Sequence, residues 1–272
     1  MDKFKIASLQ MKTEEDLSSM LCKMNGFVEK AALNGADVAV LPEMWSCPYA
    51  TKYFVKAAQS GHEAVFSSMA EAAARNGIIL VGGSVPECSE GRLYNSCFVF
   101  DRNGELLAKH RKIHLFDVDL PEMHFKESAT FTAGSVPTVI NTEFGCFGVA
   151  ICFDVRFPEL FRLMANRGAE VIFLPAQFNM TTGPAHWETT LRARAIDNQL
   201  FLAACSAARN TDFSYNCYGH SMTVDPFGRI ISSCKEEETI IYSEIDKGII
   251  SQTRNALPTH LHLRDDIYAV AK

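Results

Sequence analysis

The chain has 272 residues, with 26 Lys and Arg against 32 Asp and Glu, so its formal net charge is −6. Hydrophobic residues make up 47% and charged residues 21% of the chain, which is typical of a globular protein and excludes disordered, collagen-like and low-complexity chains. Lys and Arg are dispersed, whereas nucleic-acid binding needs a clustered positive face. We therefore expect no nucleic-acid partner, and the length fits a single domain over residues 1–272.

The N-terminus carries charged residues, and no apolar run approaches the ~18 residues that a membrane span needs. The nine cysteines include no Cys-x-x-Cys pair, which is typical of reduced thiols in a cytosol-like compartment. These features predict a cytoplasmic protein with no membrane partner. The short basic run at residues 109–112 is typical of a solvated strand end.

Strands and helices alternate through the first half of the chain. Residues 4–9 form an apolar strand candidate, and apolar residues spaced by three and four predict a helix over 14–32 that ends near Gly35. The other elements predicted in this half are strands over 37–41, 78–81, 94–100 and 105–109 and a helix over 66–75. Asn103 and Gly104 join the last two strands in a predicted hairpin.

The second half repeats this scheme. Its predicted elements are strands over 147–151, 170–174, 200–205 and 239–245, helices over 158–167 and 187–198, and a turn over 225–228. Alternating elements interrupted by hairpins predict an α/β fold with mixed sheets. Residues 35–43 resemble residues 168–176, which indicates either two related halves packed face to face or two ordinary crossovers. Only the first copy ends in a carboxylate, Glu43, at a strand end where ligands bind in open α/β sheets.

Three reactive side chains follow apolar strands: Glu43, Lys112 and Cys152. Each alone has an ordinary structural explanation, as a solvated edge residue, a surface lysine and a buried thiol. Together they supply the base, the cation and the nucleophile that a thiol needs to hydrolyse an amide. In this interpretation Cys152 attacks the carbonyl carbon, and Glu43 carries the proton in both half-reactions. Lys112 and the backbone N–H of Phe153 stabilise the oxyanion.

Residues 41–43, 110–116 and 149–159 resemble the Glu-Lys-Cys motifs of the nitrilase superfamily of carbon–nitrogen hydrolases, in order and in spacing. The resemblance covers essentially the whole chain. It implies an αββα sandwich of two mixed sheets covered by helices, a homodimer or larger homo-oligomer, no cofactor, and a second catalytic glutamate at Glu127. Residues 176–188 and 192–199 look like the omega-amidase branch. That branch implies hydrolysis of the terminal amide of 2-oxoglutaramate and 2-oxosuccinamate.

Such a substrate carries a carboxylate remote from the scissile bond. Arg156 can hold this carboxylate bidentately, or it can pair with Asp154 or Glu159 as part of the scaffold. The other positions that match the family's pocket, and that could instead be plain core, are Tyr49, Phe153, Phe178 and Thr182. The chain departs from the family's pattern at residues 120–124 and at Gln177, which leaves the acyl substrate open.

Several alternatives remain at this stage. Within the enzyme class these are a deaminated-glutathione amidase and an N-carbamoyl amino acid or amine hydrolase. In a different class, the scaffold could bind small molecules without catalysis. The histidine pairs at 110 and 114 and at 260 and 262 lack a third ligand, so no metal site is expected. His114 is interpreted as a hydrogen-bonding residue beside the lysine.

Overall fold

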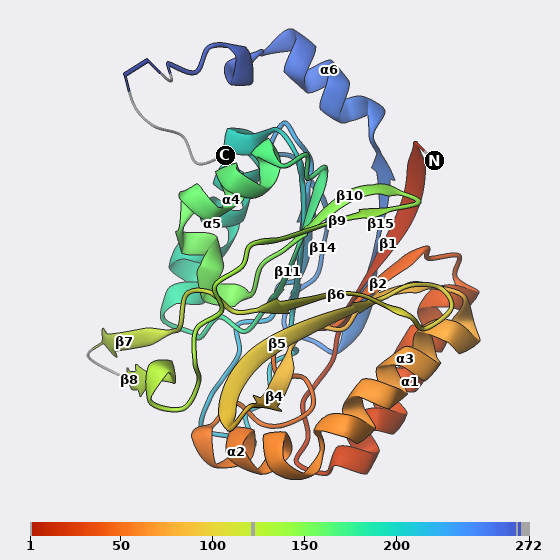
Figure 1. Cartoon of the computed structure of the whole chain (residues 1–272), viewed down its shortest axis with the longest axis vertical. Coiled ribbons are helices and arrows are strands. Elements are labelled where there is room, and N and C mark those ends of the chain that lie inside the picture. The colour runs from red at the N-terminus through yellow and green to blue at the C-terminus, as the bar shows by residue number, and fades with distance from the viewer. Residues whose placement is uncertain (1, 121–122, 265, 268–272) are drawn as a thin grey trace.

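Two β-sheets lie face to face, with helices on both outer faces, in the computed structural model of the chain (Figure 1). The structure describes residues 2–120, 123–264 and 266–267. Helices α1 (Leu17–Leu33) and α3 (His62–Asn76) cover the first sheet, and α4 (Pro158–Asn166) and α5 (Thr182–Asn198) cover the second. This is the αββα sandwich of mixed sheets that the sequence predicts.

The first sheet has the strand order β15-β1-β2-β3-β5-β4, with β6 paired to β5. Its strands are β1 (Lys3–Gln10), β2 (Val38–Val40), β3 (Ile79–Val81), β4 (Val85–Ser89), β5 (Arg92–Phe100), β6 (Leu106–Arg111) and β15 (Thr239–Asp246). Alternate side chains of these strands pack into two different hydrophobic cores, because successive residues of a strand face opposite sides of the sheet. Ile6 and Val40 pack in the core between the sheets, whereas Ala7 and Leu9 pack under α1 and α3.

The second sheet has the strand order β14-β13-β12-β11-β10-β9. Its strands are β9 (Thr138–Thr142), β10 (Gly145–Val149), β11 (Val171–Ala176), β12 (Phe201–Ser206), β13 (Met222–Val224) and β14 (Ile230–Ser233). The central strands β10, β11 and β12 are parallel, and β11 and β12 are buried along their whole length. Because both faces of these strands are buried, their sequences are continuous apolar runs rather than alternating apolar and polar residues.

Helix boundaries follow from local capping. Helix α1 begins after Asp16, whose side chain accepts a hydrogen bond of 2.8 Å from the N–H of Ser19, so the helix starts later than predicted. Helix α5 begins at Thr182, five residues before the predicted start, where Asn179 Oδ1 accepts hydrogen bonds from the N–H groups of Thr181 and Thr182 at 3.0 and 2.7 Å.

Some elements were not predicted from the sequence. They are α2 (Thr51–Ser60), α6 (Gly248–Ala256), strands β4, β9, β13 and β14, the hairpin of β7 (Asp117–Leu120) and β8 (Met123–Lys126), and short 3₁₀ turns at Glu127–Ala129, Cys152–Arg156 and Thr259–Leu261. Most of these elements are short, so few residues carry their periodicity. In the unusual stretch 120–124, Leu120 ends β7 opposite Met123, which begins β8. Residues 121 and 122 are outside the described residues.

The expectation that the basic run at 109–112 is a solvated strand end is wrong for two of its residues. His110 and Lys112 are fully buried, whereas Lys109 and Arg111 bond the carboxylate of Glu87 at 2.8 and 2.9 Å. Strand β6 pairs with β5 in the first sheet, and the period of two along the strand divides this run between the interior and the surface.

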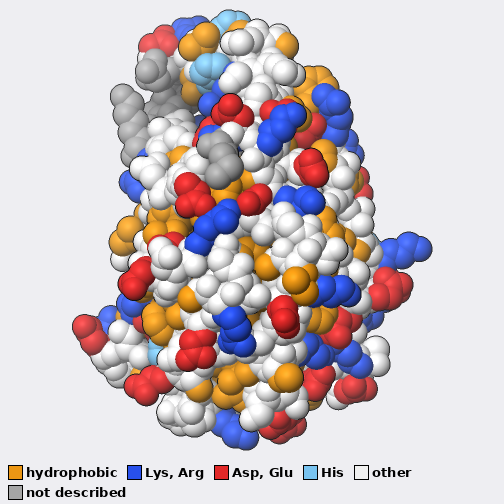
Figure 2. All heavy atoms as spheres, turned by 90° about the vertical axis from the view of Figure 1, so that its right-hand side faces the viewer, with side chains coloured by type: hydrophobic (Ala, Val, Ile, Leu, Met, Phe, Trp, Pro, Cys, Tyr) orange, Lys and Arg blue, Asp and Glu red, His pale blue; other side chains and the backbone are white. Residues whose placement is uncertain are grey.

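Figure 2 shows Lys and Arg side chains interspersed with Asp and Glu over one face of the molecule. The described part of that face carries no continuous basic patch in this view. Among the described residues, no helix is both long enough and apolar enough to cross a bilayer.

The turn that supports the end of β2 requires glycine. Gly83 has φ of +63°, and a Cβ atom there would lie 2.2 Å from the backbone oxygen of Pro42. Replacing Gly83 with Ala is expected to lower the free energy of unfolding by about 3 kcal/mol, since strain and a backbone clash add. Gly91→Ala is the matched control, because its φ is +73° but no atom lies within 4 Å of the added Cβ. The control should lose only about 1 kcal/mol in urea denaturation. Equal losses would contradict the clash.

Candidate active site

Four polar residues from different parts of the chain meet in the interior. Glu43 follows β2 and Lys112 follows β6. Glu127 directly follows β8, and Cys152 lies three residues after the end of β10. Pro42 ends hydrogen bonding in β2 and directs the chain out of the sheet, which places Glu43 at the strand's carboxyl end. The structure thus brings together all four residues that the sequence nominated as catalytic.

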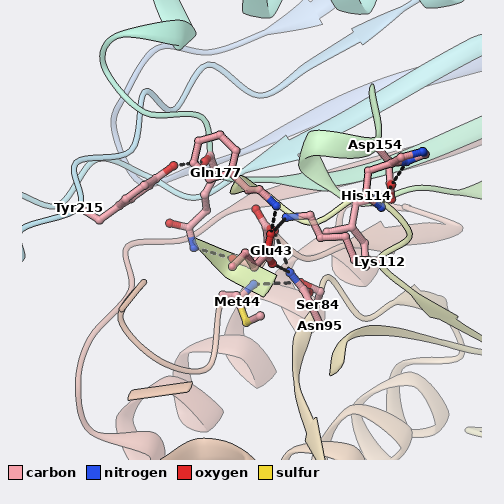
Figure 3. A network of polar contacts seen from close by, with 12 residues as sticks. Glu43, Met44, Ser84, Asn95, Lys112, His114, Asp154, Gln177 and Tyr215 are labelled. Atoms are coloured by element: carbon pink, nitrogen blue, oxygen red, sulfur yellow. Dashed lines mark hydrogen bonds and ion pairs between the residues drawn. The ribbon is translucent and has the colours of Figure 1, made fainter. Parts of the chain in front are cut away.

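Lys112 lies between two carboxylates. Its Nζ donates to Glu43 Oε1 at 2.8 Å and to Glu127 Oε2 at 2.9 Å, and all three side chains are almost completely buried. Figure 3 shows Lys112 extending toward Glu43. Burial alone would lower the pKa of Lys112, but the charges of Glu127 and Glu43 outweigh this effect and raise its pKa well above the usual value. Lys112 is therefore a permanent ammonium, suited to stabilising negative charge.

A further residue of this cluster was missed in the sequence. Asn95 Nδ2 donates to Glu43 Oε1 at 2.9 Å and to Glu127 Oε1 at 3.1 Å. The backbone N–H of Phe116 also donates to Glu127 Oε2, at 2.6 Å. The available signal was an amide side chain within a strand that is otherwise mostly apolar and buried, because a buried amide needs partners.

Cys152 occupies a sharp turn at the start of the 3₁₀ segment. Its φ is +47°, a left-handed conformation that costs a non-glycine residue roughly 1–2 kcal/mol. Ile151, just before it, is extended, so the chain changes direction at the thiol. The N–H of Phe153 lies in the first turn of this segment, where it has no acceptor within the segment. The nucleophile and the N–H of Phe153 therefore adjoin each other at the start of the segment, as in the nucleophile elbow of α/β-hydrolases.

The thiol and the carboxylate influence each other's protonation. Burial and the charge of Glu43 raise the pKa of Cys152 well above the usual value, and Lys112 only partly opposes them. Burial also raises the pKa of Glu43, with Lys112 lowering it and Glu127 raising it. Among the described residues, Glu43 Oε2 has no hydrogen-bond partner. The site therefore holds a protonated thiol beside a carboxylate oxygen that can accept its proton.

A small pocket opens onto the thiol. It is lined by Phe116, Cys152, Phe153, Arg156, Gln177, Phe178, Asn179, Thr182 and Tyr215. The guanidinium carbon of Arg156 lies 5.6 Å from the ring centroid of Phe153 and 5.1 Å from that of Phe178. In the described part of the chain, no ion pair joins Arg156 to Asp154 or Glu159, the two carboxylates of the scaffold alternative. Its Nη1 instead lies 3.2 Å from Nδ1 of His186.

The remaining predicted pocket residues differ in their positions. Tyr49 does not line the pocket but packs against Tyr215, with 4.4 Å between ring centroids and the rings tilted by 30°. Burial, together with the charges of Glu43 and Glu127, raises the pKa of Tyr49 well above its usual value. Thr182 lines the pocket, and its Oγ1 donates to Asn179 Oδ1 at 3.1 Å, in the cap of α5.

The departure from the family pattern at Gln177 has a structural function. Gln177 Nε2 donates to the backbone oxygen of Glu43 at 2.6 Å, and Tyr215 Oη donates to the backbone oxygen of Gln177 at 2.5 Å. Figure 3 shows these two contacts beside the lysine cluster. Within the described residues, no group of three or more His, Cys, Asp or Glu side chains is arranged to hold a metal ion.

The family model for carbon–nitrogen hydrolases matches residues 5–255. The chain belongs to this family. It is an enzyme of the nitrilase superfamily that hydrolyses carbon–nitrogen bonds of amides, and its similarities lie with the omega-amidase-like members.

Three relatives show the extent of this similarity. The chloroplastic omega-amidase of Arabidopsis thaliana is 44% identical over 98% of this chain and 74% of its own length. The omega-amidase NIT2 of Mus musculus is 41% identical over 99% of this chain and 98% of its own length. The crystal structure of Nit3 of Saccharomyces cerevisiae, a member of branch 10 of the superfamily, has a TM-score of 0.88 and 39% identity, covering 94% of this chain and 95% of that one.

The electrostatics of the thiol lead to a prediction about pH. Glu43→Gln removes a negative charge that raises the pKa of Cys152, so alkylation of Cys152 should begin at lower pH than in the wild type. The measurement is the rate of iodoacetamide modification against pH, followed by mass spectrometry of the peptide that contains Cys152. Glu127→Gln removes a similar charge that bonds Lys112 and should shift the profile less. Equal shifts, or a shift to higher pH, would contradict this description.

Proposed function

We propose that the protein is an omega-amidase, which hydrolyses the terminal amide of 2-oxoglutaramate and 2-oxosuccinamate to the dicarboxylate and ammonia. One observation carries the proposal: the pocket joins a buried thiol, beside a carboxylate–ammonium–carboxylate cluster, to a guanidinium that is half-buried. The omega-amidase names of two relatives support the choice of substrate class.

In the first half-reaction, Cys152 Sγ attacks the amide carbon and its proton passes to Glu43, whose Oε2 has no other partner among the described residues. Negative charge then develops on the carbonyl oxygen. Lys112 and the N–H of Phe153 stabilise this oxyanion, a contribution of roughly 3–4 kcal/mol per donor in known enzymes. Glu43 returns the proton to the leaving nitrogen, and ammonia departs as the thioester forms.

In the second half-reaction, Glu43 takes a proton from water and the resulting hydroxide attacks the thioester carbon. The tetrahedral intermediate collapses, the carboxylate product leaves, and the proton returns to the thiol. Glu127 accepts a hydrogen bond from Lys112, and Asn95 donates to both Glu43 and Glu127, so these contacts hold the Glu43 and Lys112 side chains in place. Glu43 therefore transfers a proton in each half-reaction, and the Lys112 ammonium stays in place through both.

Substrate selection is assigned to Arg156. A guanidinium binds a carboxylate through two parallel hydrogen bonds, and uncharged substrates would leave this half-buried cation unpaired. Anchoring the far end of a short acyl chain also fixes its amide carbon at Cys152. The aromatic rings of Phe153 and Phe178 line the pocket around the acyl chain, together with Thr182, and Tyr49 packs against the lining residue Tyr215.

The same thiol chemistry would serve a deaminated-glutathione amidase or an N-carbamoyl hydrolase. The omega-amidase names of two relatives favour a keto-acid amide over these substrates. We further propose that the enzyme acts in the cytoplasm as a homodimer or larger homo-oligomer.

A binding protein without catalysis is disfavoured because all four nominated catalytic groups are present and in contact or close to one another.

The proposed function predicts that Cys152→Ala abolishes ammonia release while leaving the fold intact, because Cys152 is the one cysteine among the described residues that line the pocket. Ammonia release should be measured with 2-oxoglutaramate, deaminated glutathione, an N-carbamoyl amino acid and a nitrile. Cys97→Ala removes an equally buried thiol from the core between the sheets and should retain activity. Activity in Cys152→Ala, or a preference for another substrate of the panel, would overturn the proposal.

Arg156→Ala is expected to lower kcat/KM for 2-oxoglutaramate by about a hundredfold, the effect of losing a bidentate ionic contact, while a neutral amide of similar length changes little. Arg156→Lys keeps the charge but loses the planar fork, so its effect should be intermediate. Arg192→Ala, on α5 and ion-paired with Glu188, should leave the ratio between the two substrates unchanged. A constant ratio in Arg156→Ala would mean that another residue reads the carboxylate.

A further inference from the structure

Asp154 is a fully buried carboxylate that has no place in the reaction described above. Its Oδ1 accepts hydrogen bonds from the backbone N–H of His114 at 2.9 Å and pairs with His114 Nδ1 at 2.8 Å. Its Oδ2 accepts from the backbone N–H of Ile151 at 2.9 Å and lies 3.5 Å from His110 Nε2. Both oxygens are therefore occupied, and Asp154 does not line the pocket.

These partners adjoin the two central groups of the site. His110 and His114 lie two residues before and two residues after Lys112, whereas Ile151 immediately precedes Cys152. One side chain thus connects the segment that carries the ammonium to the turn that carries the thiol. Figure 3 shows the His114–Asp154 contact beside Lys112.

We propose that Asp154 and His114 are positioning residues, which hold the Lys112 ammonium and the Cys152 thiol at the separation needed for attack on the amide. This inference rests on the proposed function for the roles of Lys112 and Cys152. The two residues act through others, because Asp154 contacts neither the pocket nor either catalytic group in any hydrogen bond of the described chain.

The surroundings make this connection rigid. The ring of His114 stacks on Phe157 with 3.6 Å between centroids and an interplanar angle of 9°. His110 Nδ1 lies 3.0 Å from Thr138 Oγ1, which anchors the other end of the network on β9. Burial opposes ionisation of Asp154, but hydrogen bonds from His110 and His114 outweigh it and hold its pKa well below the usual range. The carboxylate therefore remains an acceptor at both oxygens.

The turn at Cys152 explains why such a connection is needed. A residue with φ of +47° persists only where its surroundings determine the backbone conformation. Asp154 supplies this constraint because its Oδ2 accepts a hydrogen bond from the N–H of Ile151, just before the turn. Its Oδ1 accepts one from the N–H of His114, in the segment that carries Lys112. A displacement of about 1 Å between reacting groups can cost a hundredfold in rate.

A pair of variants at His114 tests the proposal. This side chain is 28% exposed, so both variants are expected to fold. His114→Ala removes the side-chain contact to Asp154 and leaves the backbone N–H of residue 114 in place, whereas His114→Asn keeps a side-chain N–H near the position of Nδ1. We expect His114→Ala to lower kcat tenfold or more with KM changed less than about threefold, and His114→Asn to restore most of kcat. His260→Ala, at an exposed histidine elsewhere, should behave like the wild type.

Asp154→Asn gives a second test, because an amide presents an NH₂ group to one set of donors. Its kcat should fall by about a hundredfold or more. Unchanged kcat in His114→Ala, equal losses in His114→Ala and His114→Asn, or an effect confined to KM would overturn the positioning role.

Alkylation of Cys152 by iodoacetamide at fixed pH provides a readout that needs no substrate. The rate of Cys152 alkylation in His114→Ala should differ from the wild-type rate, and the rate in His114→Asn should be closer to the wild-type value. An unchanged rate in His114→Ala would count against the proposal. If the wild type fails to hydrolyse 2-oxoglutaramate, the proposed function fails, but the alkylation pair still decides whether His114 and Asp154 position the thiol.

Discussion

The structure of the site depends on one ammonium group buried between two carboxylates. Removing Lys112, Glu43 and Glu127 from water is costly, and the attraction among them compensates only when geometry is favourable and the other polar atoms are satisfied. Asn95 and the N–H of Phe116 supply part of this satisfaction. Among the described residues, Glu43 Oε2 and Asn95 Oδ1 have no such partner, and Glu43 Oε2 is the oxygen we assign to proton transfer.

The fold brings the catalytic side chains together because several strands of the two sheets end near the site. Glu43 follows the parallel strand β2 of the first sheet, and Cys152 and Gln177 follow the parallel strands β10 and β11 of the second. The segments that leave those ends are therefore free of ladder hydrogen bonds and can carry polar side chains. Packing of the two sheets then excludes water, which strengthens every charge interaction within the cluster.

Much of this arrangement could be predicted from the sequence. Alternating elements indicated an α/β fold, and the motifs around Glu43, Lys112 and Cys152 pointed to a single site. The supporting residues were not predicted. Asn95 lies in a predicted strand and Asp154 was considered only as a partner for Arg156, because an isolated polar residue in a sequence does not show which atoms it will meet. The short elements β4, β9, β13 and β14 were also missed, since too few residues carry their pattern.

The amino-acid sequence alone determined the class of fold, the family and the identities of the nominated catalytic side chains, because periodicity and motif spacing are local properties of the chain. The tertiary structure decided the protonation and geometry of those side chains. Burial raised the pKa of Cys152 although a lysine is close by, and Asp154 joined the lysine segment to the thiol turn across 40 residues of sequence. Desolvation and long-range hydrogen bonds depend on what surrounds a group in space, and only the folded chain specifies that.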